Sequence, residues 1–168
     1  MILIGLGGNL PSPRFGAPPA TLRAALTRLA EHGVRTVRRS RWYRTAPVPD
    51  DGGPWYTNGV AHLETDLQPR DLLLLLLRIE AEMGRIRTIR DAPRLIDLDL
   101  LAYHEYRTWH SPAPALPPEI PHPRLHERAF VLLPLDEIAP DWRHPALGRS
   151  ESELIAALPP RQQVAALA

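Results

Sequence analysis

Two aspartates that lie two positions apart are the residues of this sequence whose types and spacing best suit chemistry. Ile96, Leu98 and Leu100 alternate with Asp97 and Asp99, and this period-2 pattern predicts a strand. Side chains two apart on a strand point to the same face, so we expect the two carboxylates side by side, opposite a fully apolar face. Paired carboxylates are ligands that hard divalent cations prefer.

A run of guanidinium groups directly precedes this strand. It comprises Arg85, Arg87, Arg90 and Arg94. Planar guanidinium groups bind phosphate oxygens with two parallel hydrogen bonds, so a nucleoside triphosphate with magnesium would suit both the arginines and the aspartates. A strand with a polar, solvent-facing side next to an arginine-rich surface loop explains the pattern equally well. The residues alone leave both interpretations open.

The composition narrows the possible chemistry. All twenty basic residues are arginine, because the sequence contains no lysine. Mechanisms that need a lysine, such as those of P-loop proteins, protein kinases and Schiff-base enzymes, are therefore excluded. The absence of cysteine excludes disulfides, thiolate nucleophiles and zinc knuckles. A formal charge of +1 gives no long-range attraction to nucleic acid or to a membrane.

The length predicts a single domain spanning residues 1–168, in which about 150–168 form a peripheral C-terminal tail. The apolar residues 1–4 are too few for a signal segment, and the leucine run over 72–77 is too short to span a membrane. We therefore expect a cytoplasmic protein with no membrane partner, present as a monomer or a weak homodimer.

The order of the expected elements is β-α-β-β-α-β, which is typical of a ferredoxin-like α+β sandwich, here with additional strand and helix elements. The first half of the chain is expected to form a strand over 1–6, a helix with an apolar stripe over 22–29, a weakly alternating strand over 34–43, a loop over 45–54 and a strand over 55–65. A helix over 69–84 and the aspartate strand follow. After them we expect a short helix or strand over 130–138 and one or two helical turns over 154–158, before the tail frays.

Two further motifs suggest close contacts. The glycines of Gly5-Leu6-Gly7-Gly8-Asn9 follow the first strand, but Leu10 takes the place of the third glycine of a dinucleotide fingerprint, so a close backbone approach is the better interpretation. Asn58 lies on a strand face that also carries Tyr56. An amide next to an aromatic ring can recognise a flat heterocycle through one donor and one acceptor, although an asparagine bonded to backbone has the same pattern.

Seven segments, in this order along the chain, resemble the 6-hydroxymethyl-7,8-dihydropterin pyrophosphokinases of folate biosynthesis. They are Gly5-Leu6-Gly7-Gly8-Asn9-Leu10, Trp42-Tyr43-Arg44-Thr45-Ala46-Pro47, Tyr56-Thr57-Asn58, Ile79-Glu80-Ala81-Glu82-Met83-Gly84-Arg85, Pro93-Arg94-Leu95-Ile96-Asp97-Leu98-Asp99, Pro121-His122-Pro123-Arg124 and Glu127-Arg128-Ala129-Phe130. The resemblance runs from about residue 2 to about residue 142. Its Pro-Arg-x-x-Asp-x-Asp segment is highly specific when it occurs together with the other six segments.

The resemblance implies a ferredoxin-like fold and the transfer of the terminal diphosphate of the co-substrate ATP to the pterin hydroxymethyl group, with release of AMP. It implies that Asp97 and Asp99 hold two magnesium ions, and that Arg85 and Arg94 bind the migrating phosphates. Further nucleotide contacts are expected from Glu80, Arg87, Arg90, His122 and Arg128. The expected pterin pocket consists of Thr45, Val48, Tyr56, Asn58 and Phe130. Both expected partners are small molecules, and no nucleic acid is among them.

Three positions depart from the pattern of the family. Asp91 stands where many members have a tryptophan, so we expect the arginine loop to close less tightly over the pterin. Gly8 stands where a serine is frequent, which removes a hydroxyl contact, and Pro123 replaces an aromatic residue of some members. None of the three touches the aspartate pair.

Four other interpretations remain to be separated from this one. An RNA-binding module of the same fold would need aromatic residues in the K/R-G-F/Y motif, which the sequence lacks. Asp97-Leu98-Asp99 also matches the DxD motif of nucleotide-sugar transferases, which usually have a larger nucleotide domain. His122 and His126 have a spacing found in zinc sites, but Pro123 interrupts a helix there and no third ligand is evident. A catalytically silent scaffold of this fold stays open.

Overall fold

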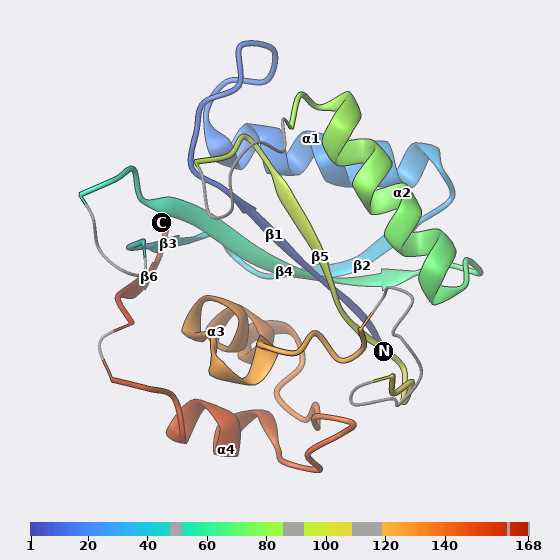
Figure 1. Ribbon diagram of the computed structural model, residues 1–168, viewed down its shortest axis with the longest axis vertical. Coiled ribbons are helices and arrows are strands. Elements are labelled where there is room, and N and C mark those ends of the chain that lie inside the picture. The colour runs from blue at the N-terminus through green and yellow to red at the C-terminus, as the bar shows by residue number, and fades with distance from the viewer. Residues whose placement is uncertain (48–51, 86–92, 109–118, 161, 168) are drawn as a thin grey trace.

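The computed structural model describes residues 1–47, 52–85, 93–108, 119–160 and 162–167. The strands are β1 (Ile2–Gly8), β2 (Arg35–Arg39), β3 (Tyr43–Thr45), β4 (Tyr56–Glu64), β5 (Asp97–Tyr103) and β6 (Val164–Ala166). The helices are α1 (Pro18–Glu31), α2 (Pro69–Glu82), α3 (Ala129–Ile138) and α4 (Glu151–Ala156), with a 3-10 helix at Leu125–Glu127. One helical layer lies on each side of a single sheet (Figure 1).

The sheet is antiparallel at every described pairing. Its order is β5-β1-β4-β3-β6, and β2 pairs with the part of β4 that β3 leaves free. In the middle of the sheet, Gly7 of β1 faces Asn58 of β4 on one side and Asp97 of β5 on the other. Directly paired residues of antiparallel strands share a face, so these three positions lie side by side on one face.

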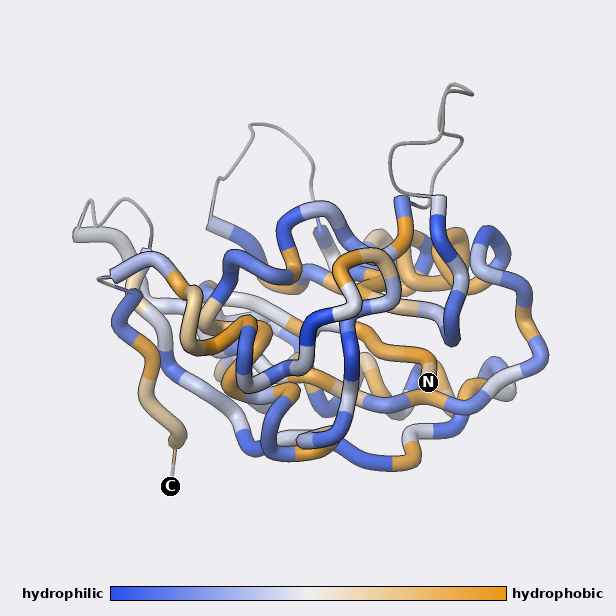
Figure 2. Tube along the Cα trace, turned by 90° about the horizontal axis from the view of Figure 1, so that it is seen from below, coloured by the Kyte–Doolittle hydropathy of each residue, from blue (hydrophilic) through white to orange (hydrophobic). Residues whose placement is uncertain are grey.

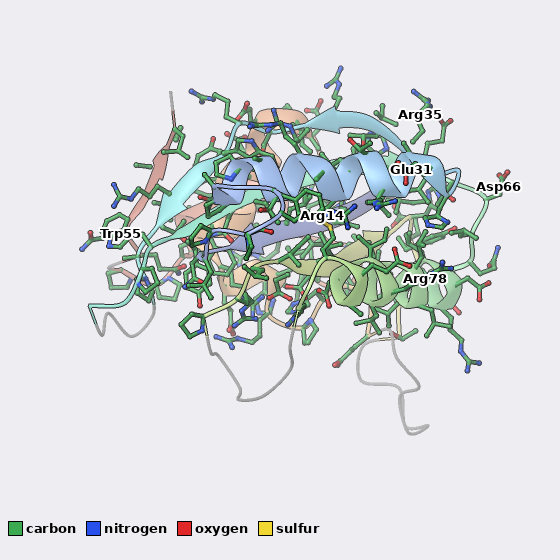
Figure 3. The ribbon with its side chains drawn as sticks, turned by 90° about the horizontal axis from the view of Figure 1, so that it is seen from above. Arg14, Glu31, Arg35, Trp55, Asp66 and Arg78 are labelled. Atoms are coloured by element: carbon green, nitrogen blue, oxygen red, sulfur yellow. The ribbon has the colours of Figure 1, made fainter. Side chains whose placement is uncertain are left out.

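Helices α1 and α2 cover one face of the sheet (Figure 1). Pro18 and Pro69 occupy their first turns, where the fixed φ of proline suits a helix and its missing N–H costs no bond. Charged residues such as Glu31 and Arg78 lie on the exposed sides of the two helices (Figure 3). The buried sides pack on the sheet in a core that includes Leu22, Leu29, Leu72, Leu76, Ile4, Leu6, Leu98 and Leu100.

Helices α3 and α4 lie on the opposite face, where they enclose a second core. The short helix α4 begins with a capping box, in which the Ser150 hydroxyl accepts from the Glu153 N–H and the Glu153 carboxylate accepts from the Ser150 N–H. Six residues would not form a stable helix alone, so packing against α3 must hold it. The second core includes Leu3, Val60, Leu101, Leu132, Leu135, Trp142 and Leu154.

The predicted ferredoxin-like sandwich is confirmed, and two of its details differ. The expected strand over 34–43 is two strands, β2 and β3, because the regular pairing with β4 is interrupted around Ser40, whose buried hydroxyl accepts the Val60 N–H at 3.1 Å and donates to the Arg41 carbonyl at 2.7 Å. Thr45, expected at the start of a loop, is the last residue of β3. The segment at 130–138, left open between helix and strand, is helix α3.

The prediction that the tail frays after residue 158 is wrong for its last part. Residues 164–166 form strand β6, which pairs with β3 at the side of the sheet where the chain ends (Figure 1). A run of small apolar residues has no strong strand period of its own, so pairing with β3 decides its conformation.

Hydrophobic and hydrophilic residues are interspersed along the helices and strands (Figure 2). This distribution is what amphipathic elements need in order to pack one side on a sheet and expose the other. In the part of the chain that the structure describes, no helix combines the length and the apolar character needed to cross a membrane.

Candidate active site

Asp97 and Asp99 lie near the start of β5, on the face of the sheet that carries α3 and α4. Their side chains are 24% and 38% exposed, whereas Leu98 and Leu100 are buried in the core under α1 and α2. The expectation of two carboxylates on one face with an apolar face behind them is therefore confirmed. Because β1 places Gly7 and Gly5 beside them, the neighbouring strand adds no side chain that would cover the pair.

Two arginines hold the Asp97 carboxylate, one at each oxygen. Arg85 Nη1 lies 2.5 Å from Oδ1, and Arg94 Nη1 lies 2.6 Å from Oδ2. Burial lowers the pKa of the Arg94 guanidinium, but the charge of Asp97 and the hydroxyl of Tyr56 raise it by more, so the net pKa is raised. Cationic groups on two sides of one carboxylate form a polar cluster that can exchange partners when other anions or cations arrive.

Glu80 lies behind this cluster and is only 1% exposed. Its carboxylate accepts from the Leu98 N–H of β5 at 2.7 Å and pairs with the Arg85 guanidinium. Leu98 is on the outer edge of the sheet, so the carboxylate supplies the acceptor that a further strand would otherwise provide. These contacts are those of a positioning residue for β5 and Arg85, whereas the resemblance implied a nucleotide contact.

Asp99 has a different environment from Asp97. Partial burial and the negative charge of Asp97 raise the pKa of Asp99 to about 6, and the Arg128 guanidinium at 3.7 Å acts in the opposite direction. Burial, with help from Arg128 and Arg124, lowers the pKa of His122 to about 4, so this imidazole is neutral at neutral pH. Its Nδ1 accepts the Arg124 N–H at 3.1 Å.

Asn9 fixes the backbone of Arg94, a role that sequence reasoning missed. Its side-chain oxygen accepts the Arg94 N–H at 2.8 Å, its own N–H donates to the Arg94 carbonyl at 3.0 Å, and its amide nitrogen donates to the Pro54 carbonyl at 3.1 Å. The only signal in the sequence was an amide residue directly after the glycine turn. A side chain at Gly8 would place its Cβ 2.6 Å from the Leu95 carbonyl oxygen, which confirms the predicted close backbone approach.

Gly7 lies between Asn58 and Asp97 on this face of the sheet. A Cβ at Gly7 would lie 2.7 Å from the Asn58 side-chain oxygen and 4.0 Å from the Asp97 Cβ, so the glycine leaves room for the Asn58 side chain over β1. The Asn58 amide nitrogen donates to the Thr45 hydroxyl at 2.7 Å, and both residues are buried. The amide is thus oriented by a side chain, and the alternative of an asparagine bonded only to backbone does not hold.

The structure brings most of the predicted site residues to one region. Arg85, Arg94, Asp97 and Glu80 form one contact network, and Asp99 continues it to Arg128. The Arg128 guanidinium lies 5.4 Å from the centre of the Phe130 ring. The predicted residues Val48, Arg87 and Arg90, and the atypical Asp91, lie outside the described residues.

A comparison with models of protein families supplies the observation that decides the family. The model described as 7,8-dihydro-6-hydroxymethylpterin-pyrophosphokinase (HPPK) matches residues 3–140. The chain belongs to the HPPK family. The identification made from the seven sequence segments is confirmed, and the matched range contains the whole Asp97 cluster.

Curated HPPK relatives extend the similarity over most of the chain. The 2-amino-4-hydroxy-6-hydroxymethyldihydropteridine pyrophosphokinase of Pseudomonas aeruginosa is 42% identical over 158 residues, which cover 94% of this chain and 91% of the relative. The protein of the same name from Synechocystis is 39% identical over 158 residues, covering 91% and 73%. The folic acid synthesis protein fol1 of Pneumocystis carinii is 35% identical over 149 residues, covering 89% of this chain and 19% of that longer protein.

Solved structures agree on the fold. The Plasmodium falciparum HPPK-DHPS crystallised with pteroate matches with a TM-score of 0.71 at 14% identity, covering 93% of this chain. This chain spans 44% of the length of that one. At such low identity the similarity concerns the fold alone, and it is the fold that the HPPK family implies.

Proposed function

We propose that this HPPK-family chain transfers the terminal diphosphate of ATP to the hydroxymethyl group of 6-hydroxymethyl-7,8-dihydropterin in folate biosynthesis, releasing AMP. The names of its relatives support a pyrophosphokinase of folate synthesis. The observation that carries the proposal is the strip formed by Asn58, Gly7 and Asp97, because it places a group suited to a heterocycle next to a group suited to a metal–phosphate complex.

The donor set fits magnesium. Mg²⁺ is commonly bound by one or two carboxylates together with substrate phosphates and water, and Asp97 and Asp99 offer two carboxylates on one face. Burial, and after it the negative charge of Asp97, raises the pKa of Asp99, and a divalent cation would offset the repulsion between the two carboxylates. We infer that both aspartates hold two Mg²⁺ ions against the triphosphate. Bound there, Mg²⁺ neutralises phosphate charge and orients the triphosphate.

Arg85 and Arg94 act as phosphate clamps in this proposal. In the structure their guanidinium groups neutralise Asp97, so a nucleotide–metal complex requires them to exchange this carboxylate for phosphate oxygens. Such an exchange would conserve the local charge balance, because Mg²⁺ held by Asp97 would supply the positive charge there. Phosphoryl-type transfer depends mostly on positioning and charge neutralisation, which arginines can supply without a lysine.

In this proposal the Asn58 amide forms hydrogen bonds with the edge of the pterin, and Thr45 orients the amide. The bond from the Asn58 amide nitrogen to the Thr45 hydroxyl holds the amide group in one orientation, so that its donor and its acceptor point in set directions. Tyr56 and Phe130 come from β4 and α3, and we propose that their rings flank the pterin, since aromatic faces give a flat bicycle its affinity. The hydroxymethyl oxygen would then attack the β-phosphorus of ATP, and the bond between that phosphorus and the bridging α-phosphate oxygen would break. AMP would leave with the bridging oxygen, and the hydroxyl proton would pass to solvent.

Several predictions about this enzyme do not follow from its membership of the HPPK family. The number of magnesium ions, the contacts of Val48, Arg87 and Arg90, the cytoplasmic location, the monomeric or weakly dimeric state, and the lack of nucleic-acid and membrane partners all stay predictions. None of them is needed for the reaction described above.

One coupled assay tests the function directly. The protein is incubated with ATP, Mg²⁺ and the dihydropterin, and AMP formation is followed. AMP that appears only when the pterin and the metal are both present supports the proposal. Turnover of a nucleotide sugar without AMP from ATP would favour the transferase interpretation, and absence of any turnover would favour a silent scaffold.

A further inference from the structure

The last described segment of the chain joins two walls of the candidate site. Residues 162–167, which we term the C-terminal strap, lie along β3 through pairs such as Thr45 with Val164. The Gln163 carbonyl accepts the Ala46 N–H at 3.2 Å, and the Leu167 N–H donates to the Trp42 carbonyl at 2.7 Å. The strap is therefore bonded along the strand that carries Thr45.

At its start, the strap contacts the beginning of α3 through one side chain. The Gln162 side-chain oxygen accepts the Ala129 N–H at 2.8 Å, and its side-chain nitrogen donates to the Glu127 carbonyl at 2.8 Å. Residue 128, the N-cap of α3, has no side-chain cap of its own. Gln162 thus satisfies an N–H of the first helical turn from 33 positions away, and it holds the peptide groups on both sides of Arg128.

Arg128 is the residue that this arrangement positions. Its guanidinium lies 3.7 Å from the Asp99 carboxylate and 5.4 Å from the centre of the Phe130 ring. Its backbone is extended, with φ −110° and ψ 108°, at the change from the 3-10 helix to α3. The Arg128 N–H donates to the Leu125 carbonyl at 3.3 Å, and its carbonyl accepts from the Val131 and Leu132 N–H groups at 3.0 Å. The two bonds from Gln162 hold the neighbouring groups, the Glu127 carbonyl and the Ala129 N–H, and so add to the restraint on the direction of Arg128.

We propose that Gln162 is a positioning residue that aims the Arg128 guanidinium at the nucleotide bound beside Asp99. The inference rests on the proposed function only for the identity of that ligand. Gln162 lies beyond residues 3–140, which the family model matches, and outside all seven segments that carried the family resemblance. The site therefore depends on a part of the chain that lies outside both the residues matched by the family model and the seven segments.

Binding of a nucleotide analogue provides the test. The dissociation constant of the magnesium complex of a non-hydrolysable ATP analogue is measured by calorimetry for the wild type and two variants. Gln162→Met keeps the length of the side chain but removes both bonds, and Gln163→Met is its matched control, since Gln163 is exposed and contributes its backbone carbonyl instead. We expect about tenfold weaker binding for Gln162→Met and less than about a twofold change for Gln163→Met.

A double-mutant cycle with Arg128→Ala separates positioning from general stability. If Gln162 acts through Arg128, Gln162→Met should weaken analogue binding by less than about twofold in the Arg128→Ala background, while its effect on thermal unfolding persists. An equal loss in both backgrounds, or equal effects of the Gln162 and Gln163 variants, would overturn the proposal. Wild-type protein that binds the analogue but forms no AMP would refute the function and leave this test intact. A wild type that does not bind the analogue would refute both.

Discussion

The two faces of the sheet are built from the same strands, but they carry different kinds of side chain. On the face under α1 and α2, the side chains of β1 and β5 are apolar along the whole strand, as Ile4, Leu6, Leu98 and Leu100 show. On the other face the strands change character along their length. Leu3, Val60 and Leu101 pack under α3 and α4. Asn58, Asp97 and Asp99 lie on the same face, toward the end of the sheet where β1 ends and β5 begins.

This difference shows how one small domain can have both a rigid scaffold and a polar site. The α1/α2 face buries its apolar side chains continuously and supplies most of the cohesion. The α3/α4 face covers only part of the sheet with apolar contacts, and the rest carries the polar side chains of Asn58, Asp97 and Asp99. Figure 3 shows Trp55, just before β4, at the opposite end of the molecule from Asp66, just after β4, so the strand spans this whole change of surroundings.

Loss of a carboxylate from the polar part of the α3/α4 face should have the largest effect on activity. Asp97→Ala or Asp99→Ala should reduce AMP formation by several orders of magnitude, because metal and phosphate charges lose their counter-charge. Circular dichroism and thermal unfolding should change little, since neither carboxylate is part of an apolar core. Asp66→Ala, at an exposed aspartate far from the site, is the control and should keep full activity. Near-normal turnover in either site variant would refute the metal assignment.

Matched core substitutions on the two faces sharpen the distinction between scaffold and site. Leu29→Ala in α1, a helix that carries no predicted site residue, and Leu132→Ala in α3 both remove fully buried side chains, and each should lower the free energy of unfolding by about 2–5 kcal/mol. Only Leu132→Ala should also raise the KM for ATP, because α3 begins next to Arg128. Denaturant titration gives the stability, and steady-state kinetics at a temperature where both variants are folded gives the KM. Equal kinetic effects would mean that the faces are not functionally separate.

Asn58→Ala removes the recognition group without disturbing the apolar face. The pterin should bind more weakly by about 1–3 kcal/mol, since its donors and acceptors would remain unpaired in a desolvated slot. ATP binding should change much less. Thr45→Val keeps the amide but removes its orienting partner, so we expect a smaller loss in the same direction. Calorimetry with each ligand measures both effects, and equal losses for pterin and ATP would exclude Asn58 from the pterin site.

The smallest expected effect is a pH-dependent change in thermal stability, caused by a glutamate in the α3/α4 layer. Burial and the neighbouring Asp136 raise the pKa of Glu151 to about 7, above its ordinary 4.5. A raised folded-state pKa stabilises the fold at low pH, and this stability is lost as the pH rises from about 4.5 through 7. Glu151→Gln should therefore raise Tm relative to the wild type by roughly 2–4 °C at pH 8 and by less at pH 5. The exposed Glu31→Gln in α1 is the control, and an equal shift at both pH values would contradict the assignment.

The sequence predicted the parts of this molecule that follow from local pattern. Alternation placed Asp97 and Asp99 on one face, and prolines, glycines and leucine stripes placed α1 and α2, because each of these signals acts within a few residues. The roles of Asn9 and Gln162 depend on partners 85 and 33 positions away, and no local rule encodes such contacts. Strand β6 and the break at Ser40 were missed for the same reason, since tertiary pairing decided them.

The tight crossing at Gly8 limits how freely this enzyme can exchange residues with its relatives. A Cβ there would meet the Leu95 carbonyl oxygen at 2.6 Å, so the serine frequent at this place in the family cannot be introduced without moving the segment that carries Arg94. Positions 8 and 95 are therefore sterically coupled. A serine becomes acceptable only together with a displaced backbone at 94–95, and a chimera that takes one segment from a relative must take the other as well.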